Sequence, residues 1–142
     1  KYKLVGFLTG ELKDAYQIAD LVITRAGNNV LTEIAALKKP ALVIPLESSA
    51  NDHQLANAKA YSREGAVYVM LQSHLTPEKL FSQVDRLLED PEELSFMGEK
   101  IHKFYKSDAA SIIADGLIDF YKESMEEKKE VNAKKKSKNK EN

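Results

Sequence analysis

The side chains best suited to bind a ligand lie in two polar loops, residues 24–29 and residues 47–52. Each loop follows a short apolar run and precedes a segment with helical spacing. We interpret the two loops as the walls of a ligand cleft, and the first could hold a phosphate against the free N–H groups and the positive dipole end of the helix that it opens. Gly27 supports this interpretation of the first loop. An ordinary strand-to-helix turn is the alternative.

Glu33 follows the first loop by about one helical turn, within reach of the same cleft. A carboxylate at this place can accept hydrogen bonds from the two hydroxyls of a ribose, as acidic residues do in dinucleotide-binding folds. The alternative is that the helix dipole favours an acidic residue near the helix start. The spacing alone leaves both interpretations open.

Gln54 and Asn57 follow the second loop and, at a spacing of three, share one helix face. Their amides both donate and accept hydrogen bonds, which suits sugar hydroxyls. The alternative for Gln54 is a local capping box with Asn51. His53 could donate to a phosphate or a hydroxyl, or simply be a surface histidine. No Ser/His/Asp arrangement and no paired carboxylates stand out, so the residues predict a nucleotide or nucleotide-sugar cleft without an evident catalytic base.

Two apolar runs, residues 21–23 and residues 41–44, must position these loops. A run without polar alternation suits a strand that is buried on both faces. Such strands alternating with helical segments are typical of a parallel α/β sheet, whose ligands bind at the carboxyl ends of the strands. We expect strands at residues 2–8, 21–24, 41–44 and 66–71. We expect helices at residues 11–19, from a cap at Asn28 or Asn29 to Leu37, at 51–64, at 77–90 behind a Thr76 cap, at 91–105, and from Ser107 or Asp108 onward.

The composition suits one globular domain, since 43% of the 142 residues are hydrophobic and 30% are charged. The net charge of −1 gives no general case for nucleic acid or membrane binding. Without cysteine there is no disulfide or thiolate chemistry, and three scattered histidines do not favour a metal site. No apolar run reaches the roughly 18 residues of a membrane-spanning helix. The start at Lys1, without methionine, predicts a fragment or an excised domain.

The end of the chain, residues 126–142, consists almost entirely of Lys, Glu and Asn. Such a segment cannot bury enough apolar surface to order itself, so we expect a disordered tail. Five lysines between Lys134 and Lys140 could contact anionic lipid or RNA. A solvated low-complexity tail is the alternative. The expected organisation is therefore a domain at residues 1–125 and a tail at residues 126–142.

Several short motifs occur in a fixed order between residues 19 and 58: AD, RAG, a helical glutamate, KKP, a strand that ends in IP, then HQ and NA. In this order they resemble the C-terminal domain of the MurG family of glycosyltransferases, over roughly residues 3–121. The resemblance implies a GT-B fold, with this chain forming an incomplete Rossmann-like parallel sheet followed by C-terminal helices. It also places residues 2–8 beyond strands that the chain lacks, so we expect residues 1–8 to lie apart from the strand at 21–24.

The resemblance also implies a role for each candidate residue in binding UDP-GlcNAc. Glu33 would hold the uridine ribose, and the turn that contains Leu8 would lie against the uracil. Arg25 belongs to the loop that could hold a phosphate, and Asn57 shares the helix face of Gln54. The loop and helix start that would face the diphosphate comprise Gly27, Asn28, Asn29 and Val30. The residues that would face the GlcNAc hydroxyls are Gln54 and His53.

The function implied by the resemblance is donor binding in an inverting, metal-independent transferase that moves GlcNAc to lipid I, making lipid II for peptidoglycan synthesis. No cofactor and no nucleic acid partner are expected. Catalytic residues are expected outside this chain, in an N-terminal domain that also holds the acceptor site and contacts the cytoplasmic side of the cell membrane as a peripheral protein. The chain alone would then be inactive. Two alternatives are another GT-B UDP-sugar transferase of the glycolipid type, and a non-catalytic subunit of a split GlcNAc transferase.

Overall fold

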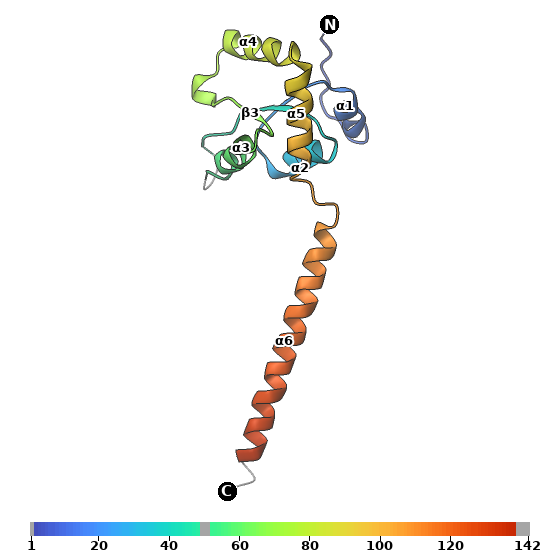
Figure 1. Ribbon diagram of the computed structural model, residues 1–142, viewed down its shortest axis with the longest axis vertical. Helices are drawn as coiled ribbons and strands as arrows, with labels where there is room; N and C mark the ends of the chain where they lie inside the picture. The colour runs from blue at the N-terminus through green and yellow to red at the C-terminus, as the bar shows by residue number, and fades with distance from the viewer. Residues whose placement is uncertain (1, 49–51, 139–142) are drawn as a thin grey trace. The chain divides into compact units, whose positions relative to one another are not determined.

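The computed structural model describes residues 2–48 and 52–138, with side chains described up to Lys128. The chain divides into two units, Lys1–Tyr105 and Lys106–Asn142, and the first ends earlier than the domain boundary expected at residue 125. Figure 1 shows the order of the elements along the chain. No helix in the described residues is both long enough and apolar enough to cross a membrane.

A parallel sheet of three short strands forms the centre of the first unit. Its strands are β1 (Val22–Thr24), β2 (Ala41–Val43) and β3 (Tyr68–Val69), in the order β1-β2-β3. The register pairs Ile23 with Leu42, and Leu42 with Tyr68. Helices α2 (Asn28–Ala36) and α3 (His53–Arg63) make the two crossovers between successive strands. The strands predicted at residues 21–24, 41–44 and 66–71 are thus confirmed, in shorter form.

Successive residues of β2 point to opposite faces of the sheet, and each face has its own core. Ala41 and Val43 pack with buried residues of α2 and α3. Leu42 and Ile44 pack with Leu87 and with other apolar side chains of α4 (Pro77–Leu88) and α5 (Pro91–His102). Because both faces are covered, β2 carries a continuous apolar run, as expected for a central parallel strand.

Two N-terminal caps match the sequence. The Thr76 side chain accepts a hydrogen bond from the Lys79 N–H, and Pro77 occupies the first turn of α4. Asp90 accepts in the same way from the Glu93 N–H at the start of α5. A short 3₁₀ helix, η2 (Gln72–His74), connects β3 to α4. These local signals explain why the starts of both helices fall where the sequence indicates.

The strand predicted at residues 2–8 is absent from the structure, which shows irregular chain at residues 2–8. The side chains of Tyr2 and Phe7 are 86% and 83% exposed. In the described residues β1 pairs only with β2, which agrees with the expectation that this segment lies apart from β1. A strand needs a neighbour to satisfy its N–H and C=O groups, and an apolar run without one stays irregular.

Among the described residues, the second unit contains one helix, α6 (Ala109–Lys138). The disordered tail predicted from Glu126 is therefore helical as far as Lys138 in the structure. Lys, Glu and Ala have high helix propensity, and no Gly or Pro follows Gly116, so a helix already begun continues through this polar stretch. Residues 139–142 lie outside the described residues.

Candidate nucleotide-sugar site

The carboxyl ends of the three strands bring together the two loops singled out in the sequence. The Ile44 N–H donates to the Thr24 carbonyl at 2.8 Å, and the Met70 N–H donates to the Val43 carbonyl at 3.0 Å. The carboxyl ends of neighbouring strands are therefore joined by backbone hydrogen bonds. The polar loops begin directly beyond these bonds, at the edge where parallel α/β sheets bind ligands.

Arg25 ties these loops together. Its Nη1 atom donates to the Ile44 carbonyl at 3.1 Å and to Gln72 Oε1 at 2.6 Å. Glu47 makes a second connection, because its carboxylate accepts from the backbone N–H and the hydroxyl of Ser73 at 3.1 and 2.9 Å. The structure thus gives Arg25, predicted from sequence as a substrate-binding residue, a role in holding the ends of β1, β2 and β3 together.

The two amides predicted to face a sugar also support the loops. Asn57 Nδ2 donates to the Ala26 carbonyl at 3.1 Å, and Gln54 Oε1 accepts from the Leu46 N–H at 3.0 Å. Both side chains belong to half-buried residues near the start of α3. The helix begins at His53 with Asp52 as its N-cap, and the Asp52 side chain makes no cap hydrogen bond. The alternative of a capping box between Asn51 and Gln54 stays a prediction. Asn51 itself lies outside the described residues.

No described side chain caps the start of α2, which is called bare below for this reason. Gly27 is its N-cap, with φ −69° and ψ 136°, and no described side chain makes a cap hydrogen bond there. Asn28 and Asn29, expected as caps, instead lie in the first turn with exposed side chains, and Val30 follows them half-buried. A Cβ added at Gly27 would meet nothing within 4 Å. The first N–H groups of α2 are therefore unscreened by side chains, an arrangement that suits an anion.

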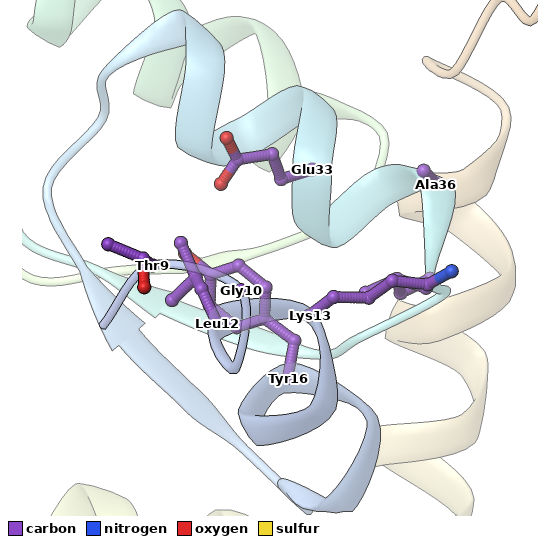
Figure 2. Close-up of a pocket in the computed structure, with 8 residues that line it drawn as sticks. Thr9, Gly10, Leu12, Lys13, Tyr16, Glu33 and Ala36 are labelled. Atoms are coloured by element: carbon purple, nitrogen blue, oxygen red, sulfur yellow. The ribbon is translucent and has the colours of Figure 1, made fainter.

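A cavity of about 370 Å³ lies between α2 and α1 (Leu12–Ile18), and Glu33 is at its edge (Figure 2). The Tyr16 ring enters it from α1, and the Glu33 carboxylate enters it from α2 (Figure 2). Burial raises the pKa of the Tyr16 hydroxyl, and the negative charge of Glu33 and a hydrogen bond with it raise that pKa further. The other lining residues are Thr9, Gly10, Leu12, Lys13, Ala36 and Leu37.

A second cavity, of about 470 Å³, shares Glu33 and Ala36 with the first. Its other lining residues are Asn28, Asn29, Thr32 and Tyr105. Glu33 thus lies between a cavity beside α1 and a cavity near the start of α2.

The candidate residues fall into two groups in the structure. Glu33, Asn28 and Asn29 come together around the cavities, whereas Arg25, Gln54 and Asn57 gather at the loops after β1 and β2. His53 is exposed at the first position of α3. Leu8 is half-buried and directly precedes the cavity residue Thr9, while Leu12 supplies the apolar wall. The sequence did not identify Tyr16 as a site residue.

Within the described residues, no group of three or more His, Asp or Glu side chains could hold a metal ion. The groups present at the site include backbone N–H groups, amides, the Glu33 carboxylate, the Lys13 ammonium and the Tyr16 ring.

A parallel sheet whose successive strands are joined by crossover helices defines a Rossmann-like domain. Within that class, the chain belongs to the glycosyltransferase family 28 C-terminal domain family, whose profile matches residues 1–115.

Similar proteins confirm the resemblance seen in the motifs. The UDP-N-acetylglucosamine--N-acetylmuramyl-(pentapeptide) pyrophosphoryl-undecaprenol N-acetylglucosamine transferase of Geobacter sulfurreducens is 36% identical over 115 residues, which are 81% of this chain and 31% of that protein. The transferase of the same name from Thermoanaerobacter sp. (strain X514) is 41% identical over 102 residues, 72% of this chain and 28% of that protein. The chain spans about a third of the length of these relatives.

A solved structure supports the fold. The crystal structure of Acinetobacter baumannii MurG matches with a TM-score of 0.67 and 33% sequence identity, covering 76% of this chain and 31% of that chain. The Rossmann-like parallel sheet of a GT-B C-terminal domain, expected from the motifs, is thereby confirmed.

Proposed function

We propose that this chain is the donor-binding part of an inverting glycosyltransferase that transfers N-acetylglucosamine from UDP-GlcNAc to lipid I, giving lipid II for peptidoglycan synthesis. The family and the names of the relatives support this chemistry. The observation that carries the proposal is the position of Glu33, at the edge of a cavity and one turn from the bare start of α2.

The donor would lie along the carboxyl edge of the sheet. The uracil would occupy the cavity beside Leu12 and the turn after Leu8, with its ribose hydroxyls on the Glu33 carboxylate. The diphosphate would accept hydrogen bonds from the N–H groups at the start of α2, with Gly27 leaving room for its oxygens. The GlcNAc would reach the start of α3. The side chains proposed to contact it are His53, Gln54 and Asn57.

In the transfer, an acceptor hydroxyl attacks C1 of GlcNAc from the face opposite the diphosphate. The C1–O bond to the β-phosphate breaks, UDP leaves with the bonding electron pair, and a base takes the proton of the acceptor hydroxyl. Negative charge develops on the leaving phosphate oxygen. Donors already aimed at that position, such as the bare N–H groups of α2, would stabilise it without a metal or other cofactor.

The remaining parts of the reaction are proposed to lie outside this chain. They are the catalytic base, the lipid I site and a peripheral contact with the cytoplasmic face of the cell membrane. The relatives' names support a lipid-linked acceptor, because undecaprenol is a lipid. Such an enzyme would serve cell-wall growth and, with it, cell shape and division.

The test is calorimetric titration of UDP-GlcNAc into the chain and into its Glu33→Ala variant. A charge-assisted hydrogen bond is worth ~1.5–3 kcal/mol, so affinity should fall about 10- to 100-fold. Glu89→Ala is the matched control, because it removes an exposed carboxylate at the end of α4, on the other face of the sheet. In the complete enzyme, Glu33→Ala should raise the KM for UDP-GlcNAc by a similar factor. Unchanged binding with an intact fold would remove Glu33 from the site.

A further inference from the structure

Tyr16 is the one aromatic side chain that lines the cavity beside Glu33. Its ring packs against the core cluster that covers one face of the sheet, whereas α1 contributes no fully buried residue. The Tyr16 side chain and the Glu33 carboxylate enter this cavity from different helices (Figure 2), and a hydrogen bond with Glu33 contributes to the raised pKa of the Tyr16 hydroxyl. The packed ring gives this hydroxyl a fixed place, which an exposed glutamate on α2 does not have by itself.

We propose that Tyr16 is a positioning residue, whose hydroxyl holds the Glu33 carboxylate in the orientation that receives the two hydroxyls of a ribose. This inference rests on the proposed function, because it assigns Glu33 to the ribose of the donor. It gives α1, which already lines the cavity through Leu12, a residue that acts on the Glu33 carboxylate.

The chemistry of the pair suits this role. A tyrosine hydroxyl donates one directional hydrogen bond, while a carboxylate offers about four lone-pair positions on its two oxygens. One oxygen position is then occupied by Tyr16 and the others stay available to a diol. Because burial and the neighbouring carboxylate raise the pKa of Tyr16, its hydroxyl keeps its proton at neutral pH and acts as the donor.

Fixing the carboxylate before the ligand arrives lowers the cost of binding. A free glutamate side chain samples many rotamers and loses them when it binds, and holding it in the bound conformation removes part of that loss. A tyrosine that only packed would have a different consequence. It would support α1 and the shape of the cavity, and its loss would weaken every nucleotide equally, with or without ribose hydroxyls.

The experiment compares UDP with 2′,3′-dideoxy-UDP, which lacks the diol, in binding to the chain and its Tyr16→Phe variant. Phenylalanine keeps the packed ring and removes only the hydroxyl. We expect Tyr16→Phe to weaken UDP about tenfold, equal to ~1.4 kcal/mol, and to leave dideoxy-UDP unchanged. Tyr68→Phe is the matched control, because its ring belongs to the core cluster on the opposite face of the sheet. It should change neither affinity.

A second variant avoids the core altogether. Glu33→Asp shortens an exposed side chain, withdraws the carboxylate from Tyr16, and should reduce the preference for UDP over dideoxy-UDP to a similar extent. When Glu33→Gln already removes the charge, adding Tyr16→Phe should cost little more, as a double-mutant cycle requires of coupled residues.

The outcomes separate the two proposals. If the unsubstituted chain binds no UDP, or binds UDP and dideoxy-UDP equally, the donor site assigned to Glu33 is wrong. If the chain prefers UDP and Tyr16→Phe keeps that preference, or weakens both nucleotides equally, the donor site stands and the positioning role of Tyr16 is overturned.

Discussion

The half-buried amides of α3 have a structural role, beside the sugar contact proposed for them. The Gln54 carbonyl oxygen accepts from the Leu46 N–H, while Asn57 donates to the Ala26 carbonyl. These bonds fix the two loops that would surround a nucleotide-sugar. A sugar contact by the same amides is thus an added use of groups that already hold the site in shape.

Gln54→Ala should therefore have two effects. The Leu46 N–H loses its partner, which costs about 1–3 kcal/mol and lowers the melting temperature. If the amide also faces the sugar, affinity for UDP-GlcNAc should fall more than affinity for UDP. Titration of both ligands together with a thermal melt measures this. Equal losses for the two ligands would assign Gln54 to the loop alone.

Gly98 lies at a close approach between two backbones, where a side chain of even one carbon would not fit. A Cβ added to this buried residue of α5 would lie 2.4 Å from the Lys38 carbonyl oxygen. Lys38 occupies the turn after α2 with φ 56°, and its ammonium pairs with Glu99 at 2.9 Å. The exposed ion pair adds little, since surface pairs contribute about 0–1 kcal/mol. The close backbone approach is the part that only glycine allows.

Gly98→Ala should destabilise the first unit by about 1–3 kcal/mol, because backbone must move to admit the methyl group. The control is Gly116→Ala in α6, where an added Cβ meets nothing within 4 Å and alanine is the better helix former by about 1 kcal/mol. Denaturant unfolding of both variants gives the comparison. A stable Gly98→Ala variant would mean that α5 can move away from the turn at little cost.

Sequence reasoning at this scale succeeded where the signal was local and failed where it was not. The Thr76 cap follows from a threonine followed by proline, and the structure confirms it. The Lys38–Glu99 pair spans 61 positions in sequence, and the contact between Tyr16 and Glu33 joins two helices across a strand. Neither contact leaves a periodic pattern, so neither could be predicted from one sequence.

Among the elements, the helices divide by how their first turns are satisfied. The helices α4 and α5 have side-chain caps from Thr76 and Asp90. The two that follow strands at the carboxyl edge, α2 and α3, have no side-chain cap from a described residue. The start of α2, which no described side chain caps, therefore lies at the edge where a ligand with negative oxygens would bind.

Gly27→Asp should raise the free energy of unfolding and lower the affinity for UDP. Its φ of −69° suits any residue, there is space for a Cβ, and an aspartate can cap the first N–H groups of α2. We expect about 0.5–1 kcal/mol more stability from the cap and the lost glycine entropy. The same carboxylate would repel a diphosphate, so UDP affinity should fall by about tenfold while uridine affinity stays unchanged.

Gly27→Ser, which caps the helix without adding charge, is the control and should weaken UDP binding less. An unchanged UDP affinity in Gly27→Asp would place the diphosphate elsewhere.

The elements themselves were predictable where an apolar run had a partner within the chain. The runs at residues 21–24 and 41–44 pair with each other, so their composition and their structure agree. The similar run at residues 2–8 has no partner in the described chain, and composition alone cannot reveal that. The Asn28 and Asn29 caps were wrong because Gly27, one position earlier, already takes the extended conformation of an N-cap.

For the molecule as a whole, the arrangement of the sheet predicts a gradient of protection. Amide hydrogen exchange on the chain should be fast at residues 3–7 and slow at residues 42–44. The first segment has exposed side chains and no strand pairing, while β2 is buried between β1 and β3. Equal protection in the two segments would show that the N-terminal segment forms a pairing in solution that the structure lacks.

The contacts of α5 with the C-terminal end of α2 influence the position of the other end of α2. Gly98 of α5 lies against the Lys38 carbonyl, and His102 Nδ1 lies 2.9 Å from the Ala35 carbonyl. These contacts hold the C-terminal end of α2, while its N-terminal end lies at the carboxyl edge of the sheet. Its nine residues make a lever arm of ~13 Å. A tilt of about 5° at the C-terminal end would move the free end by ~1 Å, a displacement that can cost roughly 10²-fold in rate at a reacting centre. If the N–H groups at the start of α2 bind the leaving phosphate as proposed, their direction depends on contacts at the opposite end of the helix, and a substitution there would change the angle of α2.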